Sequence, residues 1–123
     1  MSTSVDSGGF TVSSILNEAG VNYIAFLWAD DESVDSRVRC GEYTNVDGGD
    51  VYVGFAPQWL LLKVIDGVSD WRIVDAVRGD EIALSANTAN VESGEAGVVL
   101  GGDGFAAGSF GVGKKIIFVA IRS

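Results

Sequence analysis

The sequence contains no histidine, one cysteine and one proline in 123 residues. Without histidine, the chain cannot build the usual zinc sites, a Ser-His or Cys-His nucleophile pair, or a histidine pH switch. Cys40 has no second cysteine to pair with, so an intrachain disulfide is excluded. We therefore expect a fold held together by its apolar core, for which a hydrophobic fraction of 47% is sufficient.

Long apolar runs and basic residues are also scarce. No segment is long enough to span a bilayer, and the first residues lack the basic and apolar regions of a secretory signal. We therefore expect synthesis in a host cytoplasm, without an export signal. Eight bases against seventeen acids give a net charge of −9, which disfavours nucleic acid and anionic membranes as partners.

Glycine, in contrast, is abundant, and apolar residues gather in short runs. Seventeen glycines without a Gly-X-Y period indicate many tight turns. The run from Trp59 to Ile65 is apolar at nearly every position except Lys63, and it has the length of a strand. A run that is apolar on both faces must be covered on both faces, so we expect it to be a central strand of a two-layer β structure.

The rest of the chain gives the same pattern, with turn signals every 8–12 residues and no helical stripe of three turns. Residues 71–77 should return antiparallel to the central strand through an Asp66-Gly67 turn. The expected strands are residues 9–13, 21–28, 37–43, 51–55, 59–65, 71–77, 81–86, 96–100, 105–109 and 114–122. This pattern predicts an all-β fold, an antiparallel β-sandwich or jelly roll, with residues 9–123 as one domain and residues 1–8 as a flexible or clasping arm.

The two ends of the chain resemble each other. Residues 9–14 align with residues 104–109, and residues 23–27 align with residues 116–120. Each end has a Gly-Phe strand, a glycine-bearing turn and an apolar strand. Any β-hairpin could give this likeness. The alternative is a repeating unit cut at an unusual point, whose tail forms the first 31 residues.

Several motifs resemble a repeat domain of tail and other virion proteins of marine bacteriophages. They are the Gly-Phe-Ala-Pro-Gln-Trp run with its Lys63, the Asp-Trp-Arg-Ile-Val-Asp run with Arg78, the segments 23–26, 40–45, 86–89 and 103–105, and the strand 116–120. The resemblance implies a concanavalin A-like jelly roll with no assigned chemistry. The sequence departs from the pattern in the loop 45–50 and in a short segment between Arg78 and Asn87, where binding specificity would lie.

Charged residues near the central strand predict a structural network. Lys63 interrupts the apolar strand, Asp75 lies on the strand that should pair with it, and Arg78 follows. We expect an ion pair or network among these three, with a ligand-binding charge as the alternative.

Tryptophans are the candidates for ligand contact. We expect Trp59 and Trp71 to pack inside the fold, and an aromatic platform for a sugar ring is the alternative. Exposure of Trp28 or Trp71 on a concave surface would favour the sugar platform, whereas burial of all three tryptophans would favour packing.

Acidic loops raise the possibility of a calcium site, since hard cations prefer several oxygen ligands. Asp47 and Asp50 are the weak candidates, and the acids of residues 30–35 form a second group, but no EF-hand spacing is present. We expect solvated loops, with no metal and no cofactor. Nothing among the seventeen acids selects a facing carboxylate pair for glycoside hydrolysis, so we expect no catalytic residues and no enzyme activity.

Taken with the resemblance, these features lead us to expect a phage virion structural protein. A capsid decoration protein, cementing the capsid surface through contacts with the major capsid protein or other virion subunits, is favoured over a tail position. We expect a homo-oligomer, and a trimer would suit a local threefold position. The alternatives are a carbohydrate- or receptor-binding module of a phage tail or fibre and, beyond phage, a cellular lectin-like domain.

Overall fold

A computed structural model describes residues 4–6, 8–33, 35–46, 49–79, 82–94, 97–107 and 110–123. These residues contain strands and no helix, and so no helix that could cross a membrane. The strands are β1 (Ser4–Asp6), β2 (Gly9–Thr11), β3 (Val38–Thr44), β4 (Asp50–Tyr52), β5 (Trp59–Val64), β6 (Arg72–Asp75), β7 (Ala83–Ser85), β8 (Val98–Leu100), β9 (Gly104–Ala107) and β10 (Lys115–Ile121). All of their pairings are antiparallel, so the prediction of an all-β antiparallel fold is confirmed.

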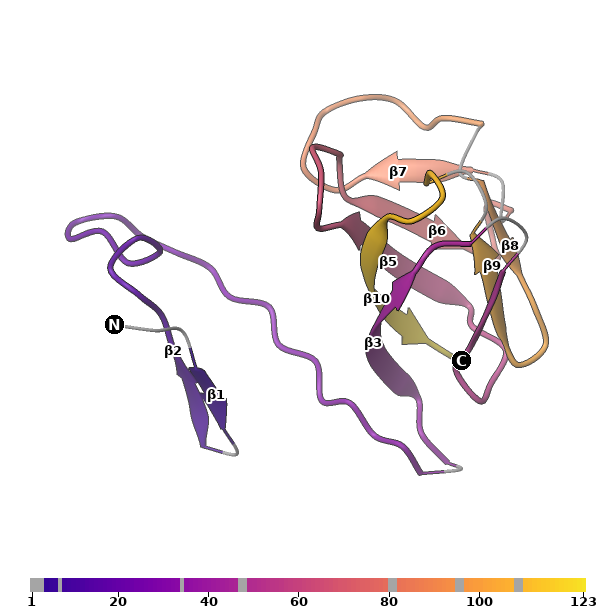
Figure 1. The fold of residues 1–123 in the computed structure, drawn as a ribbon, viewed down its shortest axis with the longest axis horizontal. Helices are drawn as coiled ribbons and strands as arrows, with labels where there is room; N and C mark the ends of the chain where they lie inside the picture. The colour runs from indigo at the N-terminus through magenta and orange to yellow at the C-terminus, as the bar shows by residue number, and fades with distance from the viewer. Residues whose placement is uncertain are drawn as a thin grey trace.

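Two of the sheets build one body, formed by residues 35–123 (Figure 1). One sheet has the order β3-β10-β5-β6-β7 and the other the order β4-β9-β8. β5 is the middle strand of the larger sheet, between β10 and β6, as its apolar sequence predicted.

The core lies between these two sheets because alternate residues of each strand point inward. Leu60, Leu62 and Val64 point inward from β5, and Ile116, Phe118 and Ala120 point inward from β10. The smaller sheet contributes Val98 and Phe105. The remaining buried members of the core are Val53, Phe55, Val74 and Ala83. Phe105, Phe118 and Tyr43 contact one another with ring centroids 5.3–6.2 Å apart.

The segment between β4 and β5 carries the chain from one sheet to the other. Gly54 has a φ of 87°, a conformation that glycine adopts readily, and Pro57 is fully buried. The N–H groups of Val53 and Gly54 both donate to the carbonyl oxygen of Asp103, at 2.9 and 3.0 Å. These bonds continue the β4–β9 pairing past Tyr52 and so fix the point where the chain leaves the smaller sheet.

The N-terminal extension, residues 4–31, lies outside the body. Its hairpin β1–β2 stands well apart from both sheets, and a long extended segment connects it to β3 (Figure 1). The predicted strand over residues 21–28 is wrong in this respect, because the segment is extended but pairs with no strand among the described residues. The predicted arm ends at residue 8, whereas the separate hairpin includes residues 9–11.

Candidate functional site

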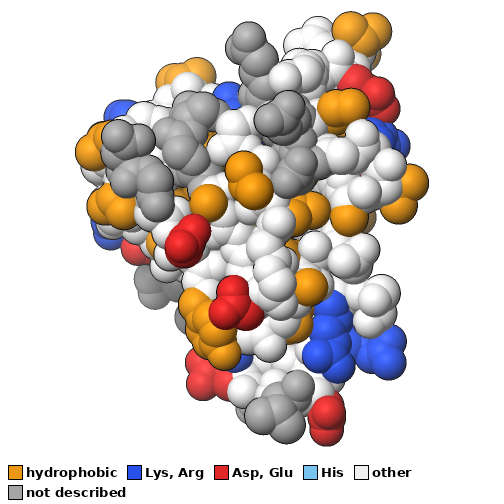
Figure 2. Space-filling model, turned by 90° about the vertical axis from the view of Figure 1, so that its right-hand side faces the viewer, with side chains coloured by type: hydrophobic (Ala, Val, Ile, Leu, Met, Phe, Trp, Pro, Cys, Tyr) orange, Lys and Arg blue, Asp and Glu red, His pale blue; other side chains and the backbone are white. Residues whose placement is uncertain are grey.

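The sheet β3-β10-β5-β6-β7 is apolar on its outer face as well as on its inner face. Strand registers place Trp59 and Leu61 of β5 beside Ile121 and Val119 of β10 and beside Ile73 of β6. These residues alternate with the core residues and so face away from the other sheet. Val38 and Cys40 of β3 extend the same face. In contrast, on the right-hand side of the molecule, apolar side chains lie scattered among polar and charged ones (Figure 2).

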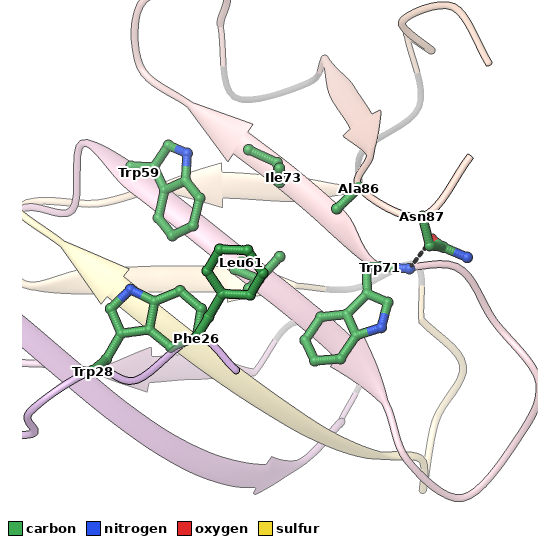
Figure 3. Close-up of a pocket in the computed structure, with 8 residues that line it drawn as sticks. All are labelled: Phe26, Trp28, Trp59, Leu61, Trp71, Ile73, Ala86 and Asn87. Atoms are coloured by element: carbon green, nitrogen blue, oxygen red, sulfur yellow. Dashed lines mark hydrogen bonds between the residues drawn. The ribbon is translucent and has the colours of Figure 1, made fainter. Parts of the chain in front are cut away.

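A groove of about 530 Å³ lies on this outer face (Figure 3). The body supplies three strand residues, Trp71 just before β6 and the two residues that follow β7, and the N-terminal extension supplies two aromatic side chains. The lining residues are Phe26, Trp28, Trp59, Leu61, Trp71, Ile73, Ala86 and Asn87. All three tryptophans of the protein therefore meet at one apolar surface.

The aromatic pair from the extension is held in place by the acidic residues that follow it. Phe26 and Trp28 stack with their ring centroids 6.3 Å apart. The N–H of Cys40 donates to Oδ1 of Asp30 at 2.8 Å, so the extension is fixed to the edge of β3. The N–H of Ser33 donates to Asp31 and lowers the pKa of this carboxyl. Asp30 also lies beside a base, since Nε of Arg39 is 3.8 Å from its Oδ1.

The opposite wall of the groove is fixed by an amide. The N–H of Trp71 donates to Oδ1 of Asn87 at 2.9 Å, and Nδ2 of Asn87 donates to Asp70 at 2.9 Å. The N–H of Ala86 donates to the carbonyl oxygen of Trp71 at 3.1 Å. These bonds hold the indole of Trp71 at the groove and leave the amide of Asn87 engaged within the protein (Figure 3).

The tryptophans predicted as possible ligand contacts both line this groove. Trp28 is 38% exposed, and Trp71 is half-buried. Trp59, expected inside the fold, lies on the outer face instead. It is an even number of residues from Lys63 on β5, so the two side chains point to the same face. Leu61, midway between Trp59 and Lys63, could have been assigned to the same face from the sequence, since side chains alternate along a strand. Phe26 and Asn87 gave no comparable signal.

Of the three charged residues predicted to form a network, Asp75 and Arg78 form an ion pair, whereas Lys63 bonds to other groups. Arg78 pairs with Asp75 and, through Nε at 2.7 Å, with Glu92. The N–H groups of Val77 and Arg78 donate to the Asp75 carboxylate, and these bonds lower its pKa. Lys63 instead donates to the carbonyl oxygens of Ser69 and Val64, at 2.7 and 3.0 Å. Both groups of contacts fix turns at opposite ends of the β5–β6 pair.

The weak metal candidates are not brought together. Asp50 is exposed on β4, and Asp47 lies outside the described residues. Within the part of the chain that the structure describes, no three acidic or cysteine side chains cluster closely enough to hold a metal ion. Cys40 is half-buried on the outer face, and burial raises the pKa of its thiol, so the reactive thiolate is disfavoured there.

In a comparison with known families, residues 1–117 match a family described as a domain of unknown function (DUF7483). The chain belongs to this family. The matched stretch includes the N-terminal extension together with most of the body, so both are features of the family domain. No curated protein and no solved structure matches the chain.

Proposed function

We propose that this protein is a bacteriophage virion structural protein, a capsid decoration protein that acts by contact with the major capsid protein and with its own copies. The observation that carries this proposal is the N-terminal extension, which leaves the body and exposes large apolar side chains. Phe26 and Leu27 are 75% and 73% exposed, and Ile15 is 88% exposed. Exposed apolar side chains gathered in one segment are typical of a protein interaction site.

The groove supports contact rather than catalysis. Its lining is apolar apart from Asn87, and the side-chain oxygen and nitrogen of Asn87 already bond to Trp71 and Asp70. An apolar surface of this kind suits the core of a protein interface, where aromatic side chains are enriched. The acidic surface fits a protein that works without nucleic acid or a membrane.

The finer fold assignment belongs to the same proposal. We assign the body to the concanavalin A-like jelly rolls because the chain alternates between the two sheets. It crosses from β3 to β4 and back to β5, then from β7 to β8, and finally from β9 to β10. The resemblance of the central motifs to phage virion repeat domains supports both the jelly roll and the virion. A closed homo-oligomer, with a trimer at local threefold positions, follows from this location.

Immunogold labelling of purified phage particles that carry this protein tests the proposal. Label spread over the head is expected for a decoration protein on the capsid surface. Label confined to the tail tip would contradict decoration. Particles without label would overturn the virion assignment altogether, provided that the same antibody detects the protein in the infected cell.

The tail-tip outcome would favour a second function, a carbohydrate- or receptor-binding module. The observation that supports it is the exposure of Trp28 in a groove that also holds Trp59 and Trp71. An indole face can stack on a sugar ring. A glycan array with the intact protein, and loss of the binding in Trp71→Ala, would establish this function in place of decoration.

A further inference from the structure

The protein exposes more surface than its size requires. Its solvent-accessible surface is 8029 Å², and its mass is 12.8 kDa. A compact folded monomer of this mass exposes about 6,300 Å². The excess is about 1,700 Å² per chain, which is the scale of surface that one subunit buries in a large obligate interface.

Much of this excess lies in the N-terminal extension. The backbone N–H and C=O groups of residues 22–29 make no hydrogen bond to any other described residue. Its exposed large apolar side chains are Phe10, Ile15, Leu16, Val21, Tyr23, Ile24, Phe26, Leu27 and Trp28. The unpaired backbone groups of an apolar extended segment can form hydrogen bonds with another chain.

The same sequence pattern is buried where it recurs in the body. The hairpin β1–β2 pairs Val5 with Phe10, and the hairpin β8–β9 pairs Leu100 with Phe105, with the same spacing. The following turns match as well, since Gly20 and Gly113 have φ angles of 82° and 83°. Yet Phe105 is 2% exposed, whereas Phe10 is 43% exposed. The extension therefore repeats the pattern of the β8–β10 module, but its Phe10 is not buried as Phe105 is.

The extended segment can contact two bodies at once, because its side chains alternate between two faces. Phe26 and Trp28 lie on one face and line the groove of their own body. Tyr23 and Leu27 belong to the opposite face and are more than half exposed. β10, the matching strand of the body, likewise carries apolar side chains on both faces.

We propose that the extension packs on the outer sheet face of a second copy of this chain, around that copy's groove, and that the copies exchange their extensions in a closed oligomer. The inference rests on the self-association included in the proposed function and names the segment and the surface that produce it. Burial of the excess from two copies would give an interface of about 3,400 Å², within the range of obligate homo-oligomers.

Charge favours contact of the extension with a body over contact between two extensions. Residues 1–33 contain five acids and no base, whereas all eight bases of the protein lie in residues 37–122. Two extensions packed on each other would bring like charges together, which is unfavourable in an apolar contact. The body carries twelve acids as well as its eight bases, so the bases that could pair with the acids of the extension are found only there, beside the apolar face.

Multi-angle light scattering over a range of protein concentrations tests this inference with three full-length variants. Leu27→Asp places a charge on the free face of the extension, and Ala86→Asp places one at the exposed rim of the groove. Val112→Asp is the control, because Val112 has a similar exposure, 69%, in a turn of the body outside the groove. An unpaired carboxylate in an apolar contact should weaken self-association at least about 100-fold, and the control should match the wild type.

Mixing the two defective variants gives the sharper result. Leu27→Asp retains a normal groove and Ala86→Asp retains a normal extension, so a mixed oligomer regains at least one intact contact. We expect association in the mixture and none in either variant alone. Ile15→Asp, at a second exposed position of the extension, replaces Leu27→Asp if circular dichroism shows that the latter is unfolded.

A wild-type protein that stays monomeric at every concentration would overturn the inference, whether its extension is free or folded back. An oligomer that survives both Leu27→Asp and Ala86→Asp, or that is lost equally in Val112→Asp, would also overturn it. These outcomes are separate from the labelling of virions. If the copies exchange extensions but virions carry no label, only the proposed function is overturned. If virions are labelled but the purified protein is monomeric, only the exchange is overturned.

Discussion

Gly104 is the position where a single methyl group should disturb the body most. It pairs with Tyr52 across the β4–β9 ladder and is buried against the backbone of β4. A Cβ added there would collide with the carbonyl oxygen of Val51, and it would lie 2.9 Å from the carbonyl carbon and 3.1 Å from Cα of Tyr52. These are backbone atoms, so no side-chain rotation can relieve the contact, and β4 would have to move.

The expected cost of Gly104→Ala follows from what that movement disturbs. Overpacking alone costs about 1–3 kcal/mol. Displacement of the three-residue strand β4 would also weaken ladder hydrogen bonds worth about 1 kcal/mol each. We expect a loss of about 3 kcal/mol in the free energy of unfolding, or a fall in Tm of about 12 °C for a chain of this length.

Gly102→Ala is the matched control in the same turn. No atom lies within 4 Å of a Cβ at Gly102, and its φ is not positive, so the substitution should change stability by less than about 1 kcal/mol. Urea unfolding followed by tryptophan fluorescence measures both variants. If Gly104→Ala unfolds within about 0.5 kcal/mol of Gly102→Ala, the close approach of β9 to β4 is refuted.

Three further predictions concern single groups in the body. Tyr43→Phe should leave stability unchanged or raise it by about 1 kcal/mol at pH 7, because the buried hydroxyl has no hydrogen-bond partner among the described residues. Burial raises the pKa of Tyr43 from 10.0 to about 12, so the wild type should lose stability as pH rises from 10 through 12, a loss that Tyr43→Phe lacks. Asp75→Ala should cost about 1–2 kcal/mol at pH 7. The lowered pKa of Asp75 makes this contribution present above pH 3.8 and lost as pH falls below it, so acid unfolding should show a smaller difference between the two proteins. Gly41→Ala should cost about 1–2 kcal/mol, less than Gly104→Ala, because the added Cβ would lie 2.7 Å from the ring of Phe118, which can shift.

The strands of the body could be predicted because their apolar residues indicate burial. Residues 59–64 and 115–121 are long, apolar and free of glycine and proline, and they form the centre of the larger sheet. Period-two alternation then separates the inner residues from the outer ones. The division of the strands between two sheets could not be obtained in this way, because strand order depends on contacts between distant segments.

The groove was predictable only in part. Trp28 and Trp71 were named as possible ligand contacts from their residue type, although Trp71, like Trp59, was expected to pack inside the fold. Trp59 lies on the outer face because it is an even number of residues from Lys63, so the two side chains point to the same side of β5. Its residue type alone suggested burial instead. Asn87 acts through a bond to the backbone N–H of Trp71, sixteen residues away, and no local pattern indicates such a contact.

The failed prediction of a strand over residues 21–28 is informative for a physical reason. Apolar, strand-forming residues indicate that a segment is suited to burial in a sheet. They do not indicate which chain supplies the neighbouring strands. The segment does adopt an extended conformation, and Phe26 and Trp28 do contact a sheet. What it lacks, among the residues that the structure describes, is a hydrogen-bonded neighbouring strand. The segment has the apolar character of β10 but lacks the neighbours of β10 among the described residues, which argues for a neighbour from outside the chain. Because the β1–β2 hairpin matches the β8–β9 hairpin, another copy of this body is the surface that the segment fits best.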